Sequence, residues 1–73
     1  MQVLIDNGWI DVNVGDIFVN QHNRNFFVRV KELTNQKITY CRCNKQGNII
    51  SKISEPLTPQ RTITEFFKVF KPF

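Results

Sequence analysis

The stretch from residue 26 to residue 43 constrains the fold most, because it carries the longest uninterrupted β-strand signal in the chain. Its two halves, residues 26–33 and Lys37–Cys43, are rich in β-branched and aromatic residues, which suit a pleated surface. Residues 34–36 between them are polar and suit a turn. We therefore predict a central hairpin, around which shorter elements pack.

Side chains alternate between the two faces of a strand, so each strand of this hairpin has two sets. In the first strand an apolar set is expected in the core: Phe26, Val28 and Val30. The alternating set joins an aromatic residue to two cations and is expected on the solvent face: Phe27, Arg29 and Lys31. In the second strand Ile38 and Tyr40 are the expected core pair. Arg42 shares their side, so we expect a β-bulge to turn it outward.

Shorter elements precede and follow the hairpin. The Asn7-Gly8 pair between two apolar runs predicts an N-terminal hairpin. Ile17–Asn20 is a predicted strand, and the polar residues that follow it, up to residue 25, are a predicted loop. Residues 44–48 are a second loop in which Gly47 supplies a positive φ.

The C-terminal part predicts a strand, an excursion and a helical turn. Residues 49–53 are apolar enough for a strand, whereas residues 54–60 hold two prolines that cannot donate to a β-ladder. Thr62 and Glu65 have the spacing of a capping box, which predicts a helix start. One or two helical turns should then lead into a last strand at residues 70–73.

These elements predict an all-β fold in a single domain spanning residues 1–73. The chain has eight Ile, seven Val and seven Phe but no Ala, a composition that favours strands over helices. Five short strands with a helical turn before the last one indicate a small SH3-like barrel with an N-terminal hairpin extension. An OB-fold is the alternative, although it normally has longer strands and a helix between its third and fourth.

Three short motifs resemble those of small phage and prophage proteins with SH3-like barrels. They are the V-x-V-G-D-I-F frame at residues 12–18, the V-R-V strand at residues 28–30, and R-T-I-T-x-F-x-x-x-F at residues 61–70. The resemblance implies this fold and a viral or mobile-element origin. Because many such proteins have no assigned activity, it implies little about function.

Charge is distributed unevenly along the chain. The first 23 residues carry three Asp and no cation, while the remainder carries ten Lys and Arg against three Glu. Seven residues on or beside the central hairpin form the predicted contact surface: Arg24, Phe27, Arg29, Lys31, Lys37, Arg42 and Lys45. Cations on a strand beside an aromatic ring suit phosphate contact and base stacking. Alternatively, Phe27 covers a second apolar cluster with Leu33 or Trp9, and the cations are ordinary surface.

A second candidate interface lies near the C-terminus and consists of Phe67, Lys68, Lys71 and Phe73. Seven Phe are many for so small a barrel, so some are expected on the surface, where aromatic residues mark protein interfaces or a homodimer contact.

Catalytic and metal chemistry is poorly represented in the sequence. Cys41 and Cys43 point the same way on a strand and lie about 6.5 Å apart, too far for an easy disulfide. His22 in a polar loop completes no zinc ligand set with them and no catalytic arrangement. We predict no cofactor, no metal and no enzymatic activity. Small barrels of this kind can nevertheless assemble into oligomers whose shared pore is catalytic.

Two functions from different classes follow. The first is a non-enzymatic phage-type regulatory module that binds nucleic acid through the basic strand face. The second is a small protein that docks on an acidic host protein as an inhibitor or adaptor; a homo-oligomeric structural role is a third. The N-terminus has neither a basic region nor a long apolar run, so a cytoplasmic location is expected, within the host cell if a phage encodes the chain.

Overall fold

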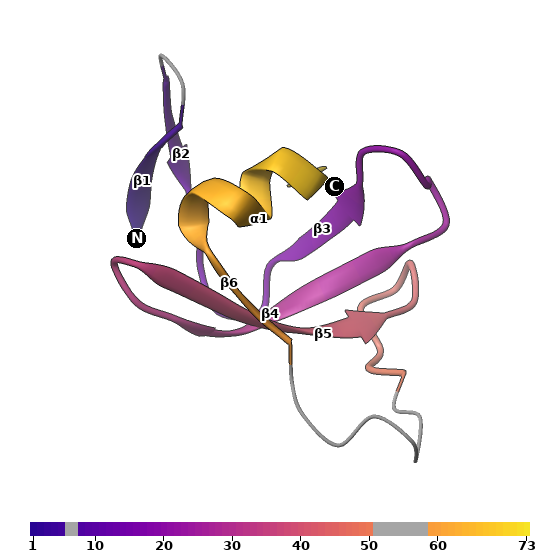
Figure 1. Ribbon diagram of the computed structural model, residues 1–73. Coiled ribbons are helices and arrows are strands. Elements are labelled where there is room, and N and C mark those ends of the chain that lie inside the picture. The colour runs from indigo at the N-terminus through magenta and orange to yellow at the C-terminus, as the bar shows by residue number, and fades with distance from the viewer. Residues whose placement is uncertain (6–7, 51–58) are drawn as a thin grey trace.

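The computed structural model describes residues 1–5, 8–50 and 59–73. The elements in these ranges are β1 (Gln2–Ile5), β2 (Gly8–Asp11), β3 (Ile17–Asn20), β4 (Phe27–Leu33), β5 (Lys37–Cys43), β6 (Gln60–Thr62), α1 (Ile63–Val69) and β7 (Phe70–Pro72). β1 and β2 form a two-stranded sheet, and the other five strands form an antiparallel sheet in the order β6-β5-β4-β3-β7 (Figure 1).

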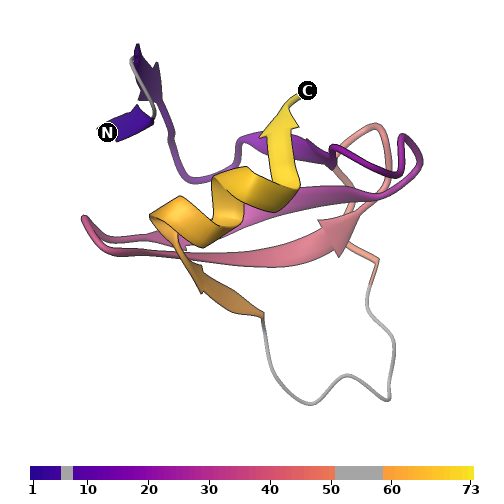
Figure 2. The same cartoon turned by 45° about the horizontal axis from the view of Figure 1, so that its top comes forward.

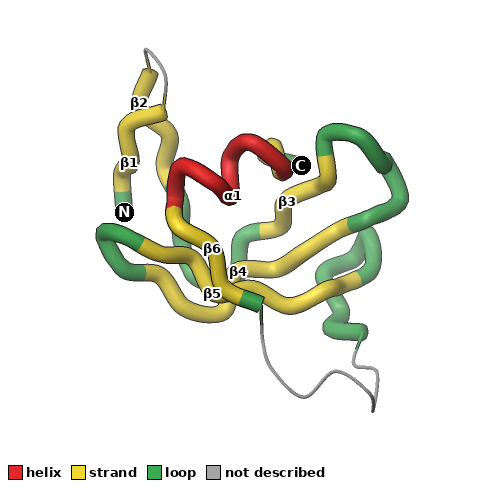
Figure 3. The backbone as a smooth tube through the Cα atoms, in the orientation of Figure 1, coloured by secondary structure: helices red, strands yellow, loops and turns green. Residues whose placement is uncertain are grey.

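The five-stranded sheet curls around the helix and resembles half of a barrel. α1 connects β6 to β7, the strands at the two edges, and crosses the concave side of the sheet in doing so (Figures 2 and 3). The predicted mostly-β, barrel-like fold is confirmed at this level. The described residues include no helix with the length and apolar character that crossing a bilayer requires.

The helix begins where the capping pattern predicts. Thr62 is the N-cap, and its hydroxyl oxygen accepts a hydrogen bond from the backbone N–H of Glu65 at 3.3 Å. This bond satisfies one of the backbone donors that a helix start leaves unpaired. The helix ends when Phe70 adopts an extended backbone and begins β7, while its N–H still bonds to the carbonyl of Phe66.

Phe66 occupies the centre of the core between the helix and the concave side of the sheet. Its ring centroid lies 5.2 Å from Phe18, 5.3 Å from Tyr40 and 4.8 Å from Phe70. The surrounding buried residues come from all parts of the chain: Val3, Val12, Phe18, Val28, Val30, Ile38, Tyr40 and Phe70. Aromatic rings therefore form the middle of this core, and aliphatic side chains surround them.

The central hairpin forms as predicted, but its β-bulge lies on the other strand. The register shifts in β4 between Val30 and Glu32, which places the irregularity at Lys31 rather than near Arg42. Arg42 pairs with Val28 and stays on the concave side, so the expectation that a bulge turns it outward is wrong. Its guanidinium carbon lies 4.4 Å from the centroid of the Phe26 ring, a cation–π contact that makes this half-buried position favourable.

Among the described strands, β6 is the one that lies beside β5, whereas the sequence predicts a strand at residues 49–53. Of that segment, Ile49 forms an isolated bridge with Cys43 and Ile50 is not in a strand, while residues 51–53 lie outside the described ranges. β6 instead pairs along β5, with Ile38 opposite Arg61. Its residues Gln60, Arg61 and Thr62 are all exposed, so no alternation of buried and exposed side chains marks them in the sequence.

The predicted N-terminal hairpin is confirmed with a different position for its glycine. Ile5 pairs with Gly8, so Gly8 is the first residue of β2, and the connection before it lies outside the described residues. Val3 and Ile10 pair and pack on the main core, which attaches the hairpin to the sheet. At the end of β2, Asp11 accepts a hydrogen bond from Asn13 and another from the amino group of Met1; these bonds lower the pKa of its carboxyl group.

Candidate nucleic-acid interface

The structure divides the predicted cations of the central hairpin between its two ends. Arg42 and Lys45 lie near the pairing of Phe27 with Cys43, where β4 begins and β5 ends. Arg24 belongs to the loop that leads into this end of β4. Lys31 and Lys37 lie toward the opposite end, beside the turn at residues 34–36. The seven predicted residues therefore do not form one continuous contact face.

We call the first group, extended by one residue of β7, the basic end; its members are Arg24, Arg42, Lys45 and Lys71. Lys71 joins them because it pairs with Val19, which in turn pairs with Phe27. The segments that build this end, residues 17–30, 40–50 and 70–73, contain no Asp or Glu. The four cations of the basic end thus lie in segments that have no acidic side chain.

Asparagine side chains shape the loop that carries Arg24. The side-chain oxygen of Asn20 accepts hydrogen bonds from the backbone N–H groups of His22 at 2.7 Å and Asn23 at 3.0 Å. Asn23 accepts in the same way from the N–H of Asn25 at 3.0 Å. Such Asx-type bonds replace the ladder bonds that a loop lacks. Arg24 is exposed on this bonded loop.

The loop that carries Lys45 is also shaped by hydrogen bonds from backbone N–H groups to an asparagine side chain. The side-chain oxygen of Asn44 accepts from the N–H groups of Gln46 at 3.0 Å and Asn48 at 2.9 Å. Gly47 has a φ of 89°, as predicted, and is buried against Ile17. The loop therefore folds back onto the sheet and leaves Lys45 exposed.

We expect Gly47→Ala to destabilise the protein by about 1–2 kcal/mol, since a left-handed backbone is unfavourable for a residue with a Cβ. A Cβ at this position would also lie 2.9 Å from Cδ1 of Ile17. Urea unfolding followed by circular dichroism measures the change. Gly8→Ala is the matched control, because no heavy atom lies within 4 Å of a Cβ built there. An equal effect of both substitutions would contradict this role of the loop.

Arg29 is exposed, but its guanidinium already has partners in the protein. Its Nε donates to the carbonyl oxygen of Gly15 at 3.3 Å, and its Nη1 donates to that of Gly47 at 3.2 Å. Arg29 thereby joins the turn before β3 to the loop after β5. It supports the loop of Lys45, and fewer of its donors remain for a phosphate than the sequence suggests.

Phe27 is buried, so the expectation that it lies on a solvent face is wrong. It packs with Val19 and Cys43 in a second small cluster on the convex side of the sheet. The ring of Phe73 meets it edge-to-face with centroids 4.9 Å apart. A second apolar cluster was the alternative interpretation, but its partners are these residues rather than Leu33 or Trp9.

The second candidate interface is also divided. Phe67 is half-buried, with its ring centroid 5.6 Å from that of Phe18 and 5.2 Å from that of Phe66, so it belongs to the main core. Lys68 forms an ion pair with Glu65 at 3.4 Å. Lys71 and Phe73 remain exposed, and Phe73 keeps 60% of its surface accessible beside the second cluster.

The remaining reactive side chains are two thiols and one imidazole. Burial raises the pKa of the Cys43 thiol, and this favours its neutral form. Cys41 is a half-buried free thiol, and His22 is exposed in its loop. Residues 1–5, 8–50 and 59–73 contain no group of three or more His, Cys, Asp or Glu arranged to hold a metal ion.

Sequence reasoning included the loop residues Arg24 and Lys45 in the contact surface, but it did not predict the hydrogen bonds that shape their loops. It placed the contact surface on a strand face, although the exposed cations at the basic end are carried by two asparagine-rich loops and by β7. The asparagines at positions 20, 23 and 44 are the sequence signal for these loops, because their side-chain oxygens accept the hydrogen bonds that shape them.

Comparison with models of protein families, with characterised proteins and with solved structures finds no match for this chain.

Proposed function

We propose that this chain is a non-enzymatic, phage-type nucleic-acid-binding module that contacts phosphates through its basic end. The observation that carries the proposal is the grouping of Arg24, Arg42, Lys45 and Lys71 in segments that contain no Asp or Glu. Positively charged side chains on a polar surface supply most of the affinity in sequence-independent nucleic-acid binding. Asparagine and glutamine side chains in the same loops add hydrogen-bond donors and acceptors.

The strand arrangement supports an SH3-like barrel as the scaffold of this module. With β3 counted as the first strand, the order across the sheet is fourth, third, second, first and fifth, and the helix precedes the fifth strand. This order and this helix position are those expected of an SH3-like barrel, and β1 with β2 forms the additional hairpin. The proposal of a phage-type module rests on this fold and on the three resembling motifs.

One exposed aromatic ring lies next to the basic end. Phe73 follows Lys71 by two positions and packs edge-on against Phe27. An exposed ring beside cations is suited to stack an unpaired base, which adds about 1–3 kcal/mol per base in single-strand binders. The proposed module therefore prefers single-stranded to double-stranded nucleic acid.

We expect binding to a 20-base-pair DNA duplex to weaken steeply as salt is added. Four phosphates contacted by four cations correspond to a log–log slope of about −3.6, since each contact contributes about −0.9 in duplex DNA. Fluorescence polarisation between low and physiological salt measures the slope, with single-stranded DNA and RNA of the same length in parallel. Absence of binding to all three at low salt would overturn the proposal.

An acidic host protein is the second candidate partner, and the burial of Phe27 favours it. The burial of this ring removes the stacking residue expected on the hairpin, so the cations of the basic end also suit a carboxylate-rich surface. Polyglutamate as a competitor separates the two candidates. Displacement of a labelled oligonucleotide at equal charge concentration would favour the acidic protein, whereas retention of the oligonucleotide favours nucleic acid.

A further inference from the structure

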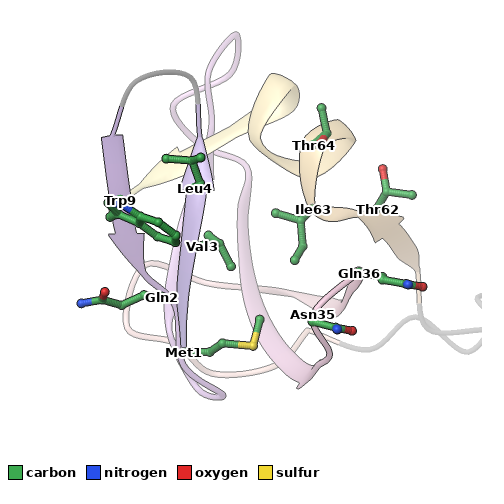
Figure 4. Close-up of a pocket in the computed structure, with 10 residues that line it drawn as sticks. All are labelled: Met1, Gln2, Val3, Leu4, Trp9, Asn35, Gln36, Thr62, Ile63 and Thr64. Carbon is green, nitrogen blue, oxygen red and sulfur yellow. The ribbon is translucent and has the colours of Figure 1, made fainter.

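A groove of about 520 Å³ separates the N-terminal hairpin from the start of the helix. β1 forms one wall, and Thr62, Ile63 and Thr64 form the other, next to the turn that contains Asn35 and Gln36 (Figure 4). Its volume lies within the usual range of ligand sites in proteins. None of the ten residues that line it carries a charged side chain. The groove therefore differs in chemistry from the basic end and lies apart from it.

The backbone of β1 directs hydrogen-bonding groups toward this groove. Met1 and Val12 exchange two backbone hydrogen bonds of 2.8 Å, so they are a hydrogen-bonded pair of the antiparallel ladder. Such pairs alternate along two antiparallel strands. The next ones are Val3 with Ile10 and Ile5 with Gly8, and the pairs between them involve Gln2 and Leu4. The N–H and C=O groups of these two residues therefore point away from β2.

These outward groups form an open strand edge. β1 pairs only with β2 among the described strands, and no hydrogen bond within the described residues occupies the backbone of Gln2 or Leu4. The strand sequence Gln-Val-Leu-Ile has no charge and no proline, the features that commonly protect edge strands from pairing. This edge is thus able to accept another strand.

Apolar side chains lie on both faces of this edge. Leu4 and Trp9 form a cross-strand pair on the outer face, with 59% and 68% of their surfaces exposed. On the inner side, Val3 and Ile63 face each other across the groove (Figure 4). A strand added beside β1 directs alternate side chains to these two faces. Apolar residues at either set of positions would be covered.

We propose that β1 binds an extended, uncharged and apolar-rich segment of a partner protein by β-strand addition. The segment takes its main-chain hydrogen bonds from Gln2 and Leu4, and its side chains pack against Leu4 and Trp9 on one face and Ile63 on the other. Main-chain bonding provides affinity and the flanking side chains provide selectivity in this mode of recognition. Gln36, Thr62 and Thr64 line the side of the groove opposite β1.

This site and the basic end lie at different ends of the molecule, which extends over 38 Å in its longest dimension (Figure 1). β1 and β2 are on one side of the helix, and the loops that carry Arg24 and Lys45 are on the other (Figure 1). The two sites can be occupied together, so a module that binds both partners would tether a protein to nucleic acid. The strand-addition site does not depend on the proposed function of the basic end.

Selection of random twelve-residue peptides displayed on phage against the full chain tests this proposal. We expect enriched peptides to be uncharged, with apolar residues at alternate positions, and to perturb the amide resonances of Gln2 and Leu4. Gln2→Pro removes the edge N–H and should weaken binding of a selected peptide at least about tenfold, because proline cannot donate. Gln2→Thr removes the same side chain, keeps the N–H, and should bind within about twofold of the original chain.

Three results would overturn the proposal: no enrichment above an empty support, equal weakening by Gln2→Pro and Gln2→Thr, or resonance changes confined to the basic end. A Gln2→Pro chain that fails to fold would show a changed circular dichroism spectrum. In that case, peptides methylated on alternate backbone nitrogens replace the variant. Loss of binding from one methylated set and not from the other supports strand addition, and equal binding of both sets overturns it.

Discussion

The double variant Arg24→Glu with Lys45→Glu is expected to lose at least about tenfold in affinity for nucleic acid at low salt. Both side chains are exposed, lie on loops at the basic end and form no ion pair within the described residues. Reversing their charges removes two phosphate contacts and adds repulsion. The log–log salt slope should therefore become shallower by about 1.8, or about 0.9 for each lost contact. Fluorescence polarisation with a labelled oligonucleotide measures both quantities.

The matched control is Lys31→Glu with Lys37→Glu. These residues are exposed toward the other end of the same hairpin, and their reversal lowers the net charge by the same amount, from +4 to zero. If the basic end is the contact surface, the control should retain most of its affinity and nearly the original salt slope. Equal losses in the two double variants would show that binding follows net charge alone, and this would contradict a localised interface.

Phe66→Ala is expected to destabilise the protein by about 3–5 kcal/mol, because truncation of a buried phenylalanine removes its packing and leaves a cavity. The Phe66 side chain is fully buried, and its ring meets those of Phe18, Tyr40 and Phe70 between the helix and the sheet. At about 0.05–0.15 kcal/mol per residue, a chain of this length has a total stability of about 4–11 kcal/mol. Much or all of it would be lost.

Urea unfolding monitored by circular dichroism measures this loss, with Phe73→Ala as the control. Phe73 is also a phenylalanine in contact with another ring, but 60% of its surface is exposed. Its removal should cost at most about 1 kcal/mol, since substitutions at exposed positions are usually small in effect. Phe66→Leu keeps part of the core volume and should give an intermediate value if the alanine variant is unfolded. A Phe66→Ala chain as stable as the control would contradict the central position of this ring.

Local patterns were sufficient to predict much of the fold. The strand Lys37–Cys43 has the bounds that the sequence predicts, and the cap formed by Thr62 and Glu65 starts the helix. Both features depend on residues close in sequence, so propensity and spacing determine them. β6 was missed for the opposite reason. Its three exposed residues carry no burial pattern, and only their pairing with β5 makes them a strand.

The candidate site was less predictable, because neighbours distant in sequence determine which strand residues are covered. The alternation of side chains along the strand correctly places Phe27 on the opposite face from Val28 and Val30. It does not indicate that a second apolar cluster lies on the convex side of the sheet. Phe73, which follows β7, and Val19 from β3 cover Phe27, and Cys43 from β5 completes the cluster. The face that we expected to be exposed to solvent therefore carries a small second apolar cluster.

By itself, the sequence determined the mostly-β class, the central hairpin, the helix start and the excess of cations after residue 23. Each follows from local backbone preference or from composition. Only the tertiary structure decided that Arg42 stays on the concave side over Phe26, that Arg29 joins two loops, and that Arg24, Lys45 and Lys71 lie at one end. The physical reason is that strand pairing and loop packing bring together side chains that are far apart in the sequence. Local sequence patterns do not show which of these side chains become neighbours.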